Sequence, residues 1–150
     1  MPRAPHPATS PTHPRTEGLE RALAVVGDRW TLAVVDALRD GRARFGALAT
    51  AVPGIASNIL ARRLVDLERA GLVTKQPYSS RPPRFAYSLT EAGHDLAVVL
   101  ASLNSWGARF ANTGDAPHHD ACGSDLEWHP WCPTCERVVG DDEAGELSWA

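Results

Sequence analysis

Residues 44–73 read RFGALATAVPGIASNILARRLVDLERAGLV, and this stretch decides the fold. Its apolar side chains recur at helical spacing on both sides of the Pro53-Gly54 pair, which predicts two short helices joined by a tight turn. The second of these helices begins near Ala56 or Ser57. Its expected core-facing side chains are Leu60, Leu64 and Leu67. Two helices arranged in this way form a helix-turn-helix.

The segment upstream predicts two further helices. The first covers residues 19–26, and the second follows Gly27, where the Asp28 side chain is suited to cap the helix. Gly41 ends the second helix, and the first helix of the helix-turn-helix then covers residues 44–51. The expected core of this helical body is Trp30, Leu38, Phe45, Leu48, Leu60, Leu64 and Leu67.

The hydrophobic period changes from helical spacing to alternation after Gly71, which predicts a β-hairpin. Its strands are residues 72–75 and 85–89, and the turn-rich segment 77–84 joins them. A hairpin with a basic tip beside a helix-turn-helix is a two-stranded wing.

A long apolar stripe follows the wing. Thr90 is a candidate N-cap, and the helix after it carries more apolar surface than a three-helix core with one hairpin covers. We therefore expect a homodimer with a two-fold contact that also involves the first helix. The residues expected at the dimer interface are Leu19, Leu23, Leu96, Val99, Leu100, Leu103, Trp106 and Phe110.

Charge is segregated along the chain in a way that suits a DNA-binding middle segment. Residues 39–84 contain nine basic side chains and three acidic ones, which gives this segment a net charge of +6. Since the whole chain has a net charge of −3, the rest of the chain has a net charge of −9. Local positive potential steers a polyanion better than total charge does. An ordinary solvated basic surface would give the same count, so charge alone leaves both interpretations open.

Several short motifs stand in an order typical of one family. They are ERAL at 20–23, VGDRWTL at 26–32, RFGAL at 44–48, PGI at 53–55, LARRL at 60–64, AGLV at 70–73, PPR at 82–84 and YSLTEAG at 87–93. Over roughly residues 17–110 the chain resembles the HxlR-type winged helix-turn-helix transcriptional regulators. This resemblance implies a homodimeric repressor or activator, with repression preferred, that binds a pseudo-palindromic operator and responds to a small-molecule or oxidant effector.

One departure from the family pattern bears on the effector. Many redox-sensing members carry a cysteine just before the first helix, where this sequence has Glu17 and Gly18. A thiol switch at that position is therefore excluded in this chain.

The second helix of a helix-turn-helix enters the major groove with its N-terminal residues nearest the bases. Asn58 suits adenine and Arg62 suits guanine, and Ser57 can cap the helix or bind a phosphate. Basic residues before the first of the two helices are better suited to phosphates, and Arg81 to the minor groove or a phosphate. The predicted DNA-binding residues are Arg42, Arg44, Ser57, Asn58, Ile59, Arg62, Arg63, Ser79, Ser80, Arg81 and Arg84.

The C-terminal segment carries a separate set of candidate ligands. His119, Cys122, Cys132 and Cys135 form two close pairs that can surround one tetrahedral Zn²⁺, and thiolate-rich sites favour that ion. The segment resembles the zinc-ribbon tails of some regulators of the same family, although Glu136 stands where such turns often have glycine. We expect one structural Zn²⁺ per subunit, with His118 and His129 as alternatives to His119.

Two other interpretations stay open, and a third is rejected. Cys132 and Cys135 can form the switch of a redox- or metal-responsive regulator. The chain can also be a protein-interaction module that does not bind DNA. A catalytic cysteine cluster around His118, His119, Asp120 and Cys122 has no oxyanion donors or substrate cleft to support it, so we predict no enzymatic activity.

The expected architecture is mainly α: a winged helix-turn-helix with a two-stranded wing, a long C-terminal dimerisation helix and a small zinc-ribbon-like tail. Residues 1–15 are expected to be a disordered, proline-rich tail, and residues 16–112 to be the DNA-binding and dimerisation domain. Residues 113–143 form the expected appendage and 144–150 a short tail. Neither a signal peptide nor an apolar run of about 18 residues is visible, so we expect a cytoplasmic protein.

Overall fold

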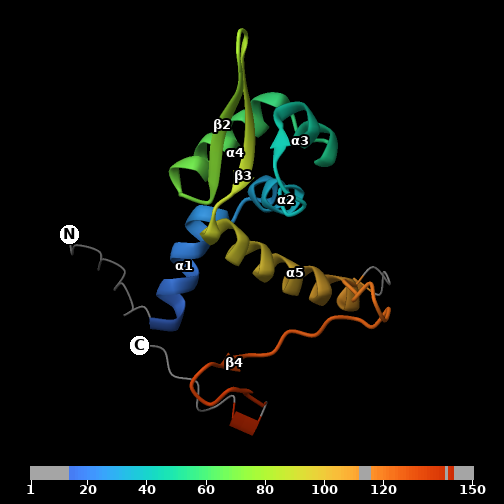
Figure 1. Cartoon of the computed structure of the whole chain (residues 1–150). Helices are drawn as coiled ribbons and strands as arrows, with labels where there is room; N and C mark the ends of the chain where they lie inside the picture. Colours follow the sequence, from blue (N-terminus) through green and yellow to red (C-terminus); the bar gives the residue numbers. More distant parts are fainter. Residues whose placement is uncertain (1–13, 112–115, 141, 144–150) are drawn as a thin grey trace, which may run out of the picture.

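The computed structural model describes residues 14–111, 116–140 and 142–143 of the 150-residue chain, with side chains from residue 16 onward (Figure 1). The disordered tail predicted for residues 1–15 falls almost entirely outside the described residues, as does the tail at 144–150. Those two expectations therefore stay predictions, and so do the exact domain boundaries.

The predicted helices are present in the described part of the chain. They are α1 (Pro14–Val26), α2 (Arg29–Ala37), α3 (Phe45–Ala51), α4 (Ser57–Arg69) and α5 (Glu91–Ala111). Helix α1 begins at Pro14, five residues before the predicted start at Leu19. Proline is tolerated in a first helical turn, because the N–H group it lacks has no partner within the helix there.

The two central helices begin in different ways. Asp28 caps α2 as predicted, since its Oδ1 accepts hydrogen bonds from the N–H groups of Trp30 at 3.0 Å and Thr31 at 3.2 Å. The N-cap of α4 is Ala56, and no side chain caps that helix. The capping role considered for Ser57 is therefore wrong, because Ser57 is already the first residue of the helix.

The wing has longer strands and one more partner than the sequence predicted. Strands β2 (Val73–Ser80) and β3 (Pro83–Leu89) form the antiparallel hairpin, and β1 (Ala43–Arg44) pairs with the other edge of β3, so the strand order is β1-β3-β2. The predicted two-stranded wing is therefore present, and β1 extends it to a three-stranded sheet. A two-residue strand has no alternating pattern of its own, so only its pairing with β3 identifies it.

The core is formed by side chains of α2, α3, α4, the base of the wing and the first half of α5. It combines the predicted Leu38, Leu48, Leu60, Leu64 and Leu67, all nearly inaccessible, with further residues outside that predicted set. Trp30 and Phe45 are half-buried and pack against this core. The additional members are Val34, Val35, Val52, Val73, Leu89, Ala97 and Leu100.

Helix α5 is anchored to the end of the hairpin by Thr90 and Gly93. The Thr90 Oγ1 accepts a hydrogen bond from the Gly93 N–H at 3.1 Å and donates one to the Gly71 carbonyl oxygen at 2.6 Å. A Cβ atom at Gly93 would lie 2.2 Å from the Leu72 carbonyl oxygen, so only glycine permits this close approach.

Beyond α5 the described residues contain one further ladder, the hairpin of β4 (Trp131–Cys132) and β5 (Arg137–Val138). No helix in the described part of the chain is both long enough and apolar enough to span a membrane.

Candidate nucleic-acid interface

Helix α4 presents a polar side to solvent because its apolar residues are committed to the core. Leu60, Leu64 and Leu67 are at most 1% exposed. On the other side of the helix the predicted recognition residues Ser57 and Asn58 are exposed, and Ile59 is half-buried. The first two turns of α4 therefore carry accessible hydrogen-bonding groups, as a recognition helix requires.

The adjacent arginines of α4 lie in different environments. The Arg62 side chain is 73% exposed and makes only a long 3.9 Å approach to Asp66. The Arg63 side chain is 24% exposed, and its Nε lies 3.1 Å from Asp28 Oδ1, while its guanidinium also approaches Asp66 at 3.4 Å. Arg62 is therefore accessible to a ligand, whereas Arg63 is engaged within the protein.

A basic hollow forms between β1, the start of α3 and the wing. Arg44 stacks over the Tyr78 ring, with 4.4 Å between the guanidinium carbon and the ring centroid. Arg42 and Arg44 border this hollow with Tyr78, and Arg84 lines its continuation along β3. The structure thus brings together three of the basic residues predicted to bind DNA. Arg42 and Arg84 are 42 positions apart along the chain.

The wing tip carries the remaining predicted residues. The Ser79 hydroxyl donates to the Pro82 carbonyl oxygen at 3.0 Å, so it helps to shape the turn. Ser80 and Arg81 are exposed at the end of the hairpin, which extends beyond the helices (Figure 1).

Sequence reasoning missed two aromatic side chains of this surface. Tyr78 stacks with Arg44, and Phe85 lies 4.1 Å below the Lys75 ammonium nitrogen. Alternation of aromatic and basic residues in the wing segment was the available signal, because a ring can orient a neighbouring cation.

The predicted dimer-interface residues divide into two groups. Leu100 belongs to the core at 9% exposure, and Leu96 packs partly against it. The other six are all at least half exposed, and Trp106 stacks on Phe110 with 5.3 Å between ring centroids. These six are Leu19, Leu23, Val99, Leu103, Trp106 and Phe110.

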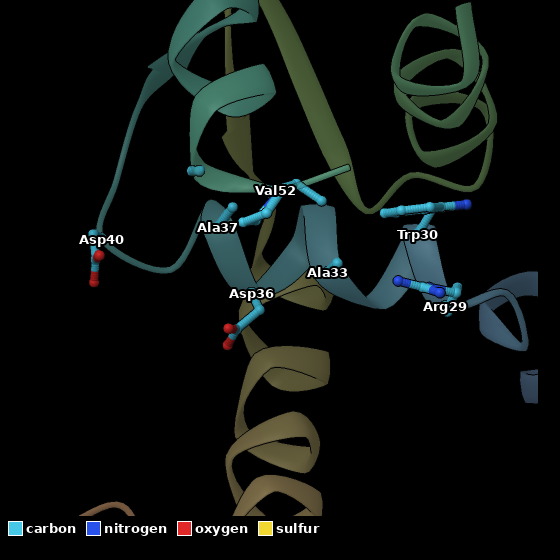
Figure 2. Close-up of a pocket in the computed structure, with 9 residues that line it drawn as sticks. Arg29, Trp30, Ala33, Asp36, Ala37, Asp40 and Val52 are labelled. Atoms are coloured by element: carbon cyan, nitrogen blue, oxygen red, sulfur yellow. The ribbon is translucent and has the colours of Figure 1, made fainter. Parts of the chain in front are cut away.

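A second hollow of about 440 Å³ lies between α2 and the chain just after α3 (Figure 2). Trp30 and Val52 supply apolar walls, and Arg29, Asp36 and Asp40 supply charge. The Arg29 guanidinium carbon lies 4.2 Å from the Trp30 ring centroid. Trp30 is the aromatic residue in the lining of this hollow.

The predicted zinc ligands are brought together in two pairs. His119 Nδ1 lies 3.4 Å from Cys122 Sγ, and Cys132 and Cys135 both lie at the turn that joins β4 to β5. Among the described residues, no group of three metal-ligating side chains is close enough to hold one ion. His118 approaches Asp120 and His129 approaches Glu127, so neither alternative histidine joins a cysteine.

Local hydrogen bonds act on each thiol. Hydrogen bonds from the side chain and backbone of Ser124 lower the pKa of Cys122. The Cys135 N–H, with further donors nearby, lowers the pKa of Cys132, whereas the contact with Cys132 raises the pKa of Cys135. One thiolate of the second pair is thus favoured over the other.

Known proteins match this arrangement over most of the chain. The HxlR-like helix-turn-helix family model matches residues 25–115. The HTH-type transcriptional regulator Rv3095 of Mycobacterium tuberculosis is 38% identical over 127 residues, which cover 82% of this chain and 80% of that protein. This match is longer than the family region, so the likeness continues outside it.

Two regulators whose structures are of the reduced form resemble the chain in structure. The reduced form of YodB from Bacillus subtilis superposes with a TM-score of 0.55 at 33% identity, covering 65% of this chain and 96% of YodB. The redox regulator HypR in its reduced form gives a TM-score of 0.60 at 30% identity, covering 64% of this chain and 95% of HypR. Both support the winged helix-turn-helix architecture.

Proposed function

The chain belongs to the HxlR-like helix-turn-helix family of transcriptional regulators, and we propose that it acts in the cytoplasm as a homodimer on a pseudo-palindromic operator. The observation that carries the proposal is the exposed N-terminal part of α4, where Asn58 and Arg62 stand free of the core. Asparagine and arginine make bidentate contacts to adenine and guanine in the major groove.

The basic hollow supplies the contacts that position the protein on DNA. Arg42, Arg44 and Arg84 are exposed around Tyr78, between α3 and the wing. Phosphate contacts of this kind set orientation and add affinity for every sequence, while base contacts from α4 distinguish one site from another. Arg81 at the wing tip is placed to reach a neighbouring groove or phosphate.

The dimer is supported by two unpartnered apolar helix faces. On α5, Val99, Leu103, Trp106 and Phe110 recur at spacings of three and four residues, the pattern of a helix-helix seam. On α1, Leu19 and Leu23 are similarly exposed. A second copy of the chain covers both faces by one two-fold contact and places two α4 helices for two half-sites.

The first test is selection of bound fragments from a genomic DNA library at fixed salt, followed by titration of the selected site. A two-fold symmetric motif, bound by one dimer far more tightly than random DNA, is the expected result. Binding that does not depend on sequence, together with capture of a specific protein, would instead indicate the interaction module. Since the matched relatives are transcriptional regulators, no enzymatic step enters this proposal.

A redox-responsive regulator is the second candidate. HypR is a redox regulator, and in this chain Cys132 and Cys135 are separated by two residues at the β4–β5 turn. Because Glu17 and Gly18 stand where many redox-sensing members of the family carry a cysteine, such a switch would have to use the C-terminal pair. A small-molecule effector would have a candidate site in the hollow beside Trp30 (Figure 2). Operator titrations with and without a mild thiol oxidant test the redox candidate.

A further inference from the structure

The C-terminal appendage contains two ten-residue hairpins of the same construction. Residues 117–126 read PHHDACGSDL and residues 130–139 read PWCPTCERVV. In both, the N–H of the tenth residue donates to the carbonyl oxygen of the first at 2.8 Å, and the second residue pairs with the ninth as antiparallel partner. The second hairpin therefore repeats the first, 13 positions later along the chain.

Each hairpin carries metal-ligating side chains at the same two positions. The third residue is His119 in one and Cys132 in the other, and the sixth is Cys122 in one and Cys135 in the other. This correspondence selects His119 over its neighbours, because His118 corresponds to Trp131 and His129 falls between the hairpins. The repeat was not recognised from the sequence, since its identical residues are only a proline and a cysteine.

The turn after the second ligand also has the same backbone conformation in both hairpins. The seventh residue is Gly123 with φ 70° and Glu136 with φ 51°, both in the left-handed region. Glutamate at this position had weakened the likeness to a zinc ribbon. Its backbone nevertheless adopts the conformation that glycine provides in the first turn.

We propose that one Zn²⁺ is bound between the two hairpins by His119, Cys122, Cys132 and Cys135. One imidazole and three thiolates form a complete tetrahedral set of the structural type. Because no three of these side chains now surround a common point, the ion must draw the turns together. Only residues 127–129 separate the hairpins, so the two turns remain within reach of each other.

The charges and protons of this site balance. Three thiols each release a proton on binding, so Zn²⁺ with three thiolates and a neutral imidazole keeps one negative charge. Arg137 lies opposite Cys132 in the β4–β5 ladder. Arg137 is itself held by two hydrogen bonds of 2.6 Å to Glu143.

The appendage also lacks a hydrophobic core of its own, which gives the ion a structural role. Among the described residues of the appendage no apolar side chain is fully buried: Leu126 is 40% exposed, Trp131 59% and Val138 47%, and Trp128 and Val139 are half-buried. A segment that buries so little apolar surface gains its folding free energy from metal binding.

The test uses the full-length chain, stripped of metal under reducing conditions and then titrated with zinc chloride or cobalt chloride. We expect one metal per chain, and with Co²⁺ the intense visible bands of a tetrahedral thiolate site. Cys122→Ser, Cys132→Ser and His119→Asn should each lose tight binding. His118→Asn and His129→Asn are the matched controls and should bind as the parent chain does.

Several outcomes would overturn the proposal. A chain that takes up no stoichiometric metal after reduction, or a cobalt spectrum typical of octahedral oxygen ligands, would exclude the site. Retention of metal by His119→Asn with loss in His118→Asn would reject the matched-hairpin assignment. A reversible Cys132–Cys135 disulfide in metal-free protein from freshly lysed cells would assign the pair to a dithiol switch instead.

Discussion

Arg63 on α4 forms an ion pair with Asp28, the residue that caps α2, with 3.1 Å between Nε and Oδ1. The same carboxylate oxygen accepts hydrogen bonds from the N–H groups of Trp30 and Thr31. Asp28 therefore links the start of α2 to the middle of the recognition helix α4. This contact helps to fix the orientation in which Asn58 and Arg62 face a ligand.

Replacement of Asp28 separates its two roles. Asp28→Ala removes the cap and the ion pair, and we expect it to lower the free energy of unfolding by about 1–2 kcal/mol. Asp28→Asn keeps a capping oxygen and loses only the charge. Because the ion pair with Arg63 is partly exposed, we expect the free energy of unfolding to fall by less than about 1 kcal/mol. Urea unfolding measures both, with Asp40→Ala as an exposed control. Equal losses for alanine and asparagine would argue against the capping role.

Base-contacting and phosphate-contacting residues should differ in how they change DNA affinity. Asn58→Ala and Arg62→Ala should each weaken operator binding by about 1–3 kcal/mol while changing random-sequence binding little. Arg44→Ala and Arg84→Ala should weaken both kinds of DNA and lower the salt slope by about 0.9 per lost phosphate contact. Fluorescence anisotropy titrations at several salt concentrations measure these effects.

Arg63→Ala is the matched control for Arg62→Ala, because the two arginines are adjacent on α4. Since Arg63 is engaged with Asp28, its replacement should reduce stability more than it changes the ratio of operator to random binding. An unchanged ratio for Arg62→Ala, with a changed ratio for Arg63→Ala, would show that the recognition face has been assigned to the wrong side of the helix.

The exposed stripe of α5 should hold the dimer together. Leu103→Glu places a charge in the middle of the seam, where burial without a partner is costly, so light scattering at micromolar concentration should show a monomeric mass. Val98→Glu is the control, because Val98 is 58% exposed but lies outside the three- and four-residue spacing of the stripe. If the parent chain is itself monomeric and one monomer binds one DNA site, the proposed two-fold dimer is wrong.

Two glycine substitutions should act in opposite directions on stability. Gly93→Ala brings a Cβ atom within 2.2 Å of the Leu72 carbonyl oxygen, and backbone atoms cannot move aside cheaply, so thermal unfolding should occur well below that of the parent. Gly46→Ala meets no atom within 4 Å and lies in α3, so a gain of up to about 1 kcal/mol is expected. A Gly93→Ala variant as stable as the parent would mean that α5 can shift away from Leu72, the residue before β2.

Local sequence patterns were sufficient for the helix-turn-helix and the zinc-ligand candidates. Helical spacing of Leu60, Leu64 and Leu67 fixes which side of α4 faces inward, and a Pro53-Gly54 turn limits where α3 can end. The thiol pair Cys132 and Cys135 needs no fold to be recognised. These features depend on residues within a few positions of one another, so the order of the residues determines them.

Long-range contacts decided the remainder. Neighbouring Arg62 and Arg63 have the same chemistry, and their difference arises because Asp28, 35 positions away, lies beside only one of them. Strand β1 exists because β3 offers an unpaired edge to Ala43 and Arg44, which carry no strand pattern themselves. The spacing of apolar residues indicates which face of a helix or strand is buried. It does not indicate which residues from distant parts of the chain will contact that element, because those contacts form only when the elements pack together.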